Sequence, residues 1–147
     1  AGAPVLKQVC APIDKMDSKM RKLLDDMAAT LYEANGVGLA APQVGVPIRA
    51  VVIDVGDDHG LVELINPQIL YREGTETDSE GCLSIPHIFG DVERSAKVTV
   101  EFMNRRGKKQ RLTGTGLMAR CIQHELDHLD GQLFIDVATS IHRGSEA

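Results

Sequence analysis

Gln123-His124-Glu125-Leu126-Asp127-His128-Leu129-Asp130-Gly131 is the stretch from which the rest of this sequence is interpreted. Two histidines stand four residues apart, and a glutamate follows the first. In an α-helix, at about 100° per residue, His124 and His128 project roughly 40° apart, so both imidazoles can bind one metal ion. Glu125 lies beside such an ion, where a carboxylate can carry a proton for a water molecule. The stretch therefore predicts a metal-binding helix, and the alternative is a solvated helix that carries two histidines by chance.

The residues around this motif extend the same helix. We expect it to cover residues 116–130 and to end at Gly131, because glycine adopts the left-handed conformation of a helix terminus easily. The face with the histidines continues toward the N-terminus as an apolar stripe. Asp127 projects away from Glu125, and we expect it to pair with Arg94 and brace the helix. Arg120 is expected at the rim of a pocket or in solvent.

A catalytic metal usually has three protein ligands and one open position, so the motif lacks a ligand. One class of metalloproteases would need a histidine at position 134, where this sequence has Phe134, and another needs a downstream glutamate, for which only the terminal Glu146 remains. Upstream, Cys82 is the best candidate, because a thiolate is a soft metal ligand. His59 and His87 are interpreted as surface histidines. A His-Glu-x-x-His endopeptidase is therefore disfavoured.

Length and composition limit the class of protein. With 147 residues, 43% hydrophobic and 25% charged, the chain fits one globular domain, residues 1–147. The formal net charge of −5 argues against a specific nucleic-acid partner, and no apolar run is long enough to cross a membrane. Three cysteines, an odd number without paired spacing, suit a reducing compartment and free or metal-bound thiols.

Hydrophobic periodicity and turn residues predict the remaining elements. A first helix should begin after an N-cap at Asp17 or Ser18 and end at Asn35-Gly36. We expect an irregular arm at 1–16, loops at 36–45 and 73–79, and strands at 49–55, 61–65, 68–71, 92–102 and 108–113. Residues 133–147 close the chain with weak periodicity and are mostly polar after Val137.

A basic cluster lies around the predicted hairpin turn at 104–107. It is interpreted as the solvated tip of that hairpin, and docking to an RNA-rich partner stays open as the alternative. The cluster consists of Arg105, Arg106, Lys108, Lys109 and Arg111.

Three stretches of the sequence resemble the three motifs of the peptide deformylases. They are Gly36-Val37-Gly38-Leu39-Ala40-Ala41-Pro42-Gln43, Glu80-Gly81-Cys82-Leu83-Ser84 and Gln123-His124-Glu125-Leu126-Asp127-His128. They stand in that family's order and at its usual separations, and the resemblance covers nearly the whole chain. It implies an α+β fold, in which small, mainly antiparallel sheets pack around a central C-terminal helix that carries the His-Glu-x-x-His motif.

The resemblance also implies a function. A peptide deformylase is a metal-dependent hydrolase that removes the N-formyl group from the N-terminal formylmethionine of nascent polypeptides and releases formate. Cys82, His124 and His128 would hold one divalent ion per chain, Fe²⁺ in the family, which Zn²⁺, Ni²⁺ or Co²⁺ can replace. The alternatives are a non-catalytic, deformylase-like binder of peptide N-termini and the endopeptidase above.

Three further residues receive catalytic roles from the resemblance. Glu125 would accept a proton from water and then deliver it to the leaving amine, as a general base that becomes a general acid. The side-chain amide of Gln43 and the backbone N–H of Leu83 would donate to the developing oxyanion.

The resemblance assigns a second group of residues to the substrate. The Val37-Gly38 backbone would pair with the substrate main chain as an added strand, and Gly81 would lie beside it. Val37, Leu117 and Cys121 are expected to line an apolar slot for the methionine side chain.

Partners and location are inferred from the same resemblance. We expect N-formylmethionyl nascent peptides as substrate, a transient ribosome contact, no membrane, and a monomer. The sequence begins at Ala1, which leaves a removed leader open. We therefore expect the bacterial cytoplasm, or an organellar matrix or stroma if a transit peptide has been removed.

Overall fold

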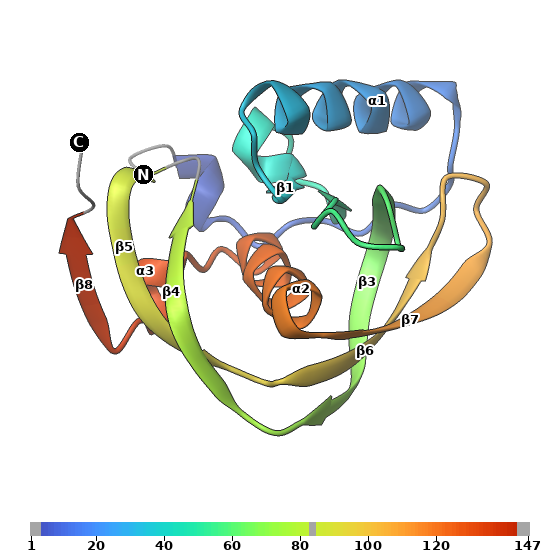
Figure 1. The fold of residues 1–147 in the computed structure, drawn as a ribbon. Coiled ribbons are helices and arrows are strands. Elements are labelled where there is room, and N and C mark those ends of the chain that lie inside the picture. Colours follow the sequence, from blue (N-terminus) through green and yellow to red (C-terminus); the bar gives the residue numbers. More distant parts are fainter. Residues whose placement is uncertain (1–3, 83–84, 144–147) are drawn as a thin grey trace.

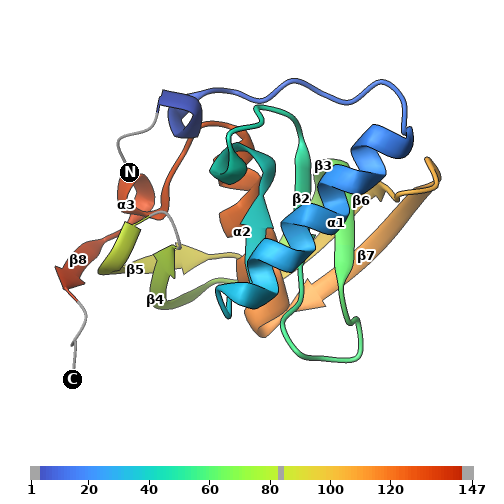
Figure 2. The same ribbon diagram turned by 90° about the horizontal axis from the view of Figure 1, so that it is seen from above.

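A computed structural model describes residues 4–82 and 85–143 of the chain. Helix α2 (Gly116–Leu129) lies at the centre, and two antiparallel sheets curve around it (Figure 1). Helix α1 (Ser18–Glu33) covers the face of β1 (Gly38–Ala40) and β2 (Ala50–Ile53) that points away from α2, as the view from above shows (Figure 2). The expected α+β class, with mainly antiparallel sheets around a C-terminal helix, is confirmed.

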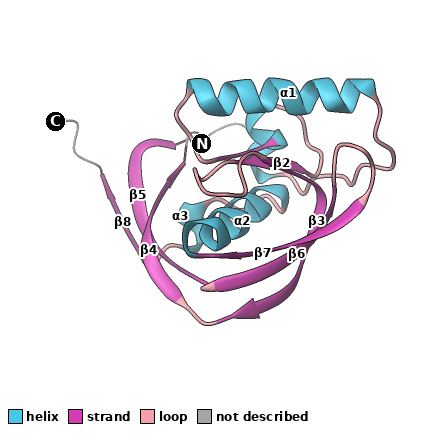
Figure 3. Cartoon of the chain, turned by 45° about the vertical axis from the view of Figure 1, so that its right-hand side comes forward, coloured by secondary structure: helices cyan, strands magenta, loops and turns pink. Residues whose placement is uncertain are grey.

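The two sheets differ in size and in their place around α2 (Figure 3). The five-stranded sheet has the order β1 (Gly38–Ala40), β2 (Ala50–Ile53), β3 (Val62–Glu73), β6 (Lys97–Met103), β7 (Lys109–Thr115). The three-stranded sheet has the order β4 (Glu76–Cys82), β5 (Ile85–Arg94), β8 (Ser140–Arg143). Short helical turns complete the fold at η1 (Pro4–Lys7), η2 (Ala41–Val44) and α3 (Phe134–Val137).

Strand β2 is buried on both faces, because α1 and α2 pack on opposite sides of it. Successive side chains of a strand point to opposite faces. Val51 and Ile53 accordingly join the apolar cluster around α2, whereas Ala50 and Val52 join the cluster under α1. The uninterrupted apolar run of this strand is explained by this double burial.

Both long helices end where the sequence predicts. The Asp17 carboxylate accepts a hydrogen bond from the Met20 N–H at 2.8 Å, which makes Asp17 the N-cap of α1. Asn35, two residues after α1, has a left-handed φ of 55°. Gly131 plays the same role after α2, with a φ of 76°.

Several expectations for less periodic segments were wrong, including the following three. The predicted loop at 73–79 is largely strand, because β4 begins at Glu76. The predicted strand at 92–102 is two strands, since β5 ends at Arg94 and β6 begins at Lys97. The tail after 133 forms α3 and the edge strand β8. The first error has a physical cause: β4 is an edge strand, and edge strands carry polar side chains, which hide the alternation.

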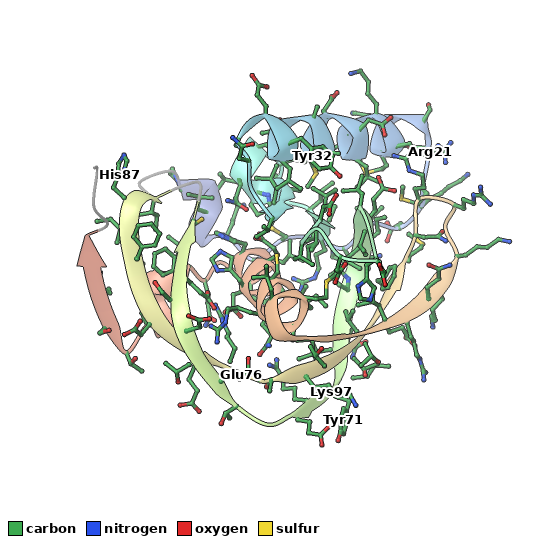
Figure 4. All side chains as sticks on the ribbon, viewed as in Figure 1. Arg21, Tyr32, Tyr71, Glu76, His87 and Lys97 are labelled. Atoms are coloured by element: carbon green, nitrogen blue, oxygen red, sulfur yellow. The ribbon has the colours of Figure 1, made fainter. Side chains whose placement is uncertain are left out.

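The basic hairpin tip is partly neutralised by ion pairs. Arg105 pairs with Glu63 and Asp25, and both Lys109 and Arg111 pair with Glu101. These pairs are typical of a solvated hairpin. At the lower edge of Figure 4, Tyr71 projects from the outer surface of the curved strands, where it is 51% exposed.

None of the helices formed by residues 4–82 and 85–143 is long and apolar enough to cross a membrane.

Candidate metal centre

Cys82, His124 and His128 converge where the end of β4 meets α2. Cys82 Sγ lies 3.4 Å from His128 Nε2, and one potential ligand atom from each residue lies within 4.8 Å of the others. Among residues 4–82 and 85–143, these three side chains form the one group of His, Cys and acidic residues close enough together to hold a metal ion. One sulfur and two imidazole nitrogens are ligands that Zn²⁺ and Fe²⁺ both accept, so the donor set fits a divalent transition metal.

The two histidines are held differently. His124 Nδ1 lies 2.8 Å from Glu80 Oε1, so its Nε2 is left for the site. Burial lowers the pKa of His124, but hydrogen bonds to Cys82 and Glu80 outweigh burial and raise that pKa to about 10, so a metal must displace a proton there. Burial, together with the charges of His124 and Arg94, lowers the pKa of His128 to about 3. His128 is therefore a neutral imidazole, the form that binds metals.

A buried ionic cluster surrounds Glu80 behind the metal ligands. Glu80 accepts hydrogen bonds from Arg94 Nε and Nη2, both at 3.0 Å, and from Arg120 Nη1. Arg94 also pairs with Asp127, which confirms the predicted brace. Burial alone would raise the pKa of Glu80, but its bonds to His124 and Arg94 lower that pKa to about 2. Glu80 is therefore an ionised carboxylate at neutral pH.

Replacing Glu80 with Gln should remove a defined part of the acid sensitivity of the metal-free chain. The pKa of Glu80 falls from 4.5 in the unfolded chain to about 2 in the fold, so the ionised carboxylate stabilises the fold above pH 4.5. This stabilisation, roughly 3 kcal/mol, is lost as the pH falls from 4.5 toward 2. Urea unfolding between pH 2.5 and 7 measures it.

A matched control for that experiment is Glu101→Gln, which changes an acidic residue in ion pairs on the outer face of the sheet. Glu101→Gln should keep the slope of unfolding free energy against pH below pH 4.5, whereas Glu80→Gln should flatten it. Parallel curves for the native chain and Glu80→Gln would contradict the ionised state of Glu80.

Glu125 lies inside the same site but outside the ligand group. It is 4% exposed, and its Oε1 has no hydrogen-bond partner among residues 4–82 and 85–143. Burial is the main cause that raises the pKa of Glu125, to about 7. A carboxyl group with such a pKa can both take and release a proton near neutral pH.

Gly38 packs directly against Glu125. A Cβ atom at Gly38 would lie 2.6 Å from Glu125 Oε2 and 2.6 Å from Cys121 Sγ. The first motif therefore needs glycine at this position, because any side chain would displace the carboxylate or the thiol.

Gln43 presents its amide nitrogen to the site. The Ala40 N–H donates to Gln43 Oε1 at 2.9 Å, which fixes the orientation of the amide. Gln43 Nε2 then points to Cys82 Sγ, at 3.5 Å. Leu83, the other predicted oxyanion donor, lies outside the described residues.

A cavity of about 400 Å³ opens beside the ligands. Val37 and Leu117 line it and are 42% and 52% exposed, so they lie at its mouth. Cys121 lines it and is buried at 4% exposure, with its thiol donating to the Val37 carbonyl at 3.6 Å. Gly81 lines the same cavity. The structure thus brings the predicted substrate-binding residues to one cavity next to the metal ligands.

The two histidines interpreted as surface residues, and Arg120, lie outside the ligand group. His59 lies 2.9 Å from Asp57 in an exposed turn, apart from the ligand group. His87 is exposed, lies along the same cavity, and points away from the upper end of β5 (Figure 4). Arg120 was expected at the rim of a pocket or in solvent. It lines the cavity, whereas the solvent alternative is wrong, because the residue is 7% exposed.

Sequence reasoning assigned no role to Glu80 or to the buried side of Arg120. One signal could have found Glu80. It precedes Cys82 by two residues, so in a strand both side chains lie on the same face. A glutamate that is buried on the face of a metal ligand must be either protonated or ionised with a charged partner, so Glu80 could have been singled out as a buried polar residue.

Comparison with known proteins gives a consistent result. The family whose sequence model matches residues 1–144 is described as polypeptide deformylase. The chain is 56% identical over 142 residues to the peptide deformylase of Desulfitobacterium hafniense, covering 97% of this chain and 93% of that protein. It is 51% identical to the peptide deformylase of Carboxydothermus hydrogenoformans, covering 97% and 92%.

Solved structures agree with the sequence comparison. The peptide deformylase of Thermotoga maritima superposes with a TM-score of 0.90 at 45% identity, covering 94% of this chain and 93% of that chain. The peptide deformylase of Synechococcus elongatus in complex with actinonin also gives a TM-score of 0.90, at 44% identity, covering 95% and 76%.

Proposed function

The chain belongs to the polypeptide deformylase family, and on that premise we propose how its own residues perform the reaction. Members of this metal-dependent family remove the N-formyl group from nascent peptides, and this chain is a hydrolase of that kind. The non-catalytic binder and the endopeptidase are the less supported alternatives. Metal-dependent hydrolysis of a formyl amide uses a bound metal ion, a proton carrier, donors to the oxyanion and a cleft for the peptide.

Cys82, His124 and His128 hold the divalent ion, through Sγ of the cysteine and Nε2 of each histidine. Their convergence, with Glu125 buried beside them, is the observation that carries this proposal. The ion would be Fe²⁺, for which Zn²⁺, Ni²⁺ or Co²⁺ can substitute; the mixed sulfur and imidazole donor set suits a divalent transition metal and does not choose between them. When bound, a divalent ion lowers the pKa of a water molecule and polarises a carbonyl.

Glu125 moves the proton of the reaction. Its carboxylate accepts a proton from the water whose oxygen attacks the formyl carbon. The C–N bond then breaks, and Glu125 delivers that proton to the leaving amine, so that formate and a free N-terminus result. The raised pKa of about 7, caused mainly by burial, supports both directions of transfer.

Gln43 and Leu83 stabilise the charge that develops on the formyl oxygen. The bond from the Ala40 N–H holds the oxygen end of the Gln43 amide, so the N–H groups are directed into the site before substrate arrives. Such preorganised donors stabilise a transition state because they need no reorientation during the reaction. The backbone N–H of Leu83, directly after Cys82 in sequence, is the second donor.

Changing Gln43 to Glu should lower kcat by roughly 10²–10³-fold and change KM little. The glutamate keeps an acceptor for the Ala40 N–H but places an acceptor where the N–H donor was. Steady-state kinetics with a formyl-Met peptide, together with metal analysis, measure this. If kcat is unchanged while one metal ion per chain is retained, Gln43 is not an oxyanion donor.

The substrate main chain binds along the free edge of β1. β1 is the edge strand of its sheet, so β2 pairs with only one of its two edges. The Val37 carbonyl accepts a hydrogen bond from the Asp54 N–H at 2.9 Å, so it points toward β2. The backbone N–H and carbonyl of the next residue, Gly38, point away from β2. Gly38 is therefore the residue that pairs with the substrate main chain. Gly81, which lines the same cavity, lies beside the peptide.

The methionine side chain enters the cavity that residues near β1 and residues of α2 line together. Cys121 forms its buried end, and Val37 and Leu117 form its mouth. The cavity volume of about 400 Å³ leaves room for an unbranched side chain and the adjoining peptide.

We also propose where the chain works. It acts as a single-domain monomer in the cytoplasm, or in an organellar matrix or stroma if a transit peptide has been removed, on N-formylmethionyl peptides near the ribosome. Exposed Arg106 and Lys108 on the hairpin turn support a transient contact with ribosomal RNA.

A direct assay separates this function from its alternatives. The anaerobically metal-loaded chain should release one formate per formyl-Met peptide and leave the peptide otherwise intact. Internal cleavage would indicate an endopeptidase, and binding without formate release would indicate a non-catalytic binder. Either result would overturn the proposal.

A further inference from the structure

The proposed metal ligands come from two parts of the fold that share little apolar packing. His124 and His128 lie on α2, and Cys82 ends β4. The apolar cluster around α2 includes residues of β2, β3 and β6 but, among the described residues, none of β4 or β5. Apolar residues of β5 belong to a separate cluster with Leu133 and Phe134. The distance between the thiol and the two imidazoles therefore depends on other contacts.

Arg120 provides several of these contacts from one side chain. It lies on α2, one turn before His124, and is 7% exposed. Its Nη1 donates to the Val92 carbonyl at 2.8 Å and to the Glu80 carboxylate. Its Nη2 donates to the Glu76 carbonyl at 2.8 Å. One guanidinium thus ties α2 to both strands of the β4–β5 hairpin, in which Cys82 is the last residue of β4.

The form of the side chain matters for this arrangement. A guanidinium presents several N–H donors in a rigid plane, so it can bind two carbonyls and a carboxylate at once. An ammonium group on the same stem could not reach all three acceptors in fixed directions. Each acceptor is buried or lies in a strand, so each bond restrains the hairpin and not a mobile side chain.

Arg94, at the end of β5, also links the hairpin to α2, because it pairs with Asp127 on that helix and with Glu80 on β4. These bonds run between side chains only. Arg120, in contrast, bonds the backbone of β4 at its start and the backbone of β5 across from it. The backbone bonds fix where β4 lies relative to α2, and thereby where its last residue lies.

We propose that Arg120 is a positioning residue for Cys82: it holds the β4–β5 hairpin against α2, so that the thiol stands at binding distance from the two histidines before a metal arrives. The proposal rests on the metal site proposed above. It concerns the metal-free chain as well, so it can fail while the assignment of the ligands stands.

Hydrogen exchange of the metal-free chain tests the restraint. Arg120→Met keeps an unbranched stem of similar length and removes the donors. Backbone amides of β4 and of the facing part of β5 should exchange at least about tenfold faster than in the native chain, while amides of α1 and β2 are unchanged. Arg111→Met, which removes an exposed ion pair with Glu101, is the matched control and should leave β4 unchanged.

Metal affinity tests the consequence. Competition with a chelator should show that Arg120→Met raises the dissociation constant for Zn²⁺ by roughly 10–100-fold, and that Arg111→Met does not. Arg120→Lys should give an intermediate loss, and it takes the place of Arg120→Met if that variant fails to fold.

A double mutant identifies the residue through which Arg120 acts. In a Cys82→Ser background, adding Arg120→Met should change the Zn²⁺ dissociation constant by less than about threefold, because the thiol to be positioned is gone. If the full loss persists in that background, Arg120 acts through Glu80 and His124, and the proposal is wrong. Unchanged exchange in β4, or unchanged affinity in Arg120→Met, would also overturn it.

Discussion

Changing Glu125 to Ala lowers kcat/KM for deformylation by roughly 10²–10⁴-fold and leaves the metal content near one ion per chain. The reason is the position of the carboxylate. It is buried in the site, yet it is not one of the side chains that converge as ligands. Removing it takes away the proton carrier and leaves the sulfur and both imidazoles in place. Formate release and metal analysis on the same sample measure both quantities.

The isosteric variant Glu125→Gln is the control for packing. It keeps the contact with Gly38 and removes only the ability to accept a proton. Equal losses in Glu125→Ala and Glu125→Gln therefore assign the effect to proton transfer. Loss of the metal together with activity would instead place Glu125 among the ligands.

Changing Cys82 to Ser should cause the largest loss of metal affinity of any single substitution in the site. A serine hydroxyl is a poor metal ligand at neutral pH because it keeps its proton, whereas a cysteine binds as the thiolate. The loss should exceed the roughly 10–100-fold typical of changes behind the ligands. Chelator competition measures it, and the sulfur-to-metal charge-transfer band of the Co²⁺-loaded chain should disappear.

The other thiols provide the comparison. Cys10 is buried in the cluster around α2 and is not part of the ligand group, so Cys10→Ser should keep the metal affinity and the charge-transfer band. If Cys82→Ser retained iron and activity in full, the third ligand would have to be another residue.

The centre of the fold could be predicted from the sequence because it depends on local spacing. The helix expected at 116–130 corresponds to α2 at Gly116–Leu129, and the histidine pair on it needs only the helical repeat. The fold class also followed from the three motifs. The part of the site that the sequence left open depends on tertiary contacts. Nothing local indicates that Arg120 turns away from solvent toward the carbonyls of two strands.

Strand β4 shows why such contacts escape prediction. Its first four residues are exposed and polar, so the segment looks like a loop, and Glu80 is its one buried residue. The partners of Glu80 lie on β5 and α2, at sequence distances that no local pattern reports. Because β4 is a polar edge strand, the sequence predicted neither the β4–β5 hairpin nor the ionic cluster around Glu80.

The central claim is that one thiolate and two imidazoles hold the metal ion. X-ray absorption at the metal edge of the zinc-loaded chain tests this most directly. The coordination shell should contain one sulfur at about 2.3 Å and two imidazole nitrogens at about 2.0–2.1 Å, with a further light atom. A shell of nitrogen and oxygen atoms without sulfur, or one with two sulfurs, would contradict the claim.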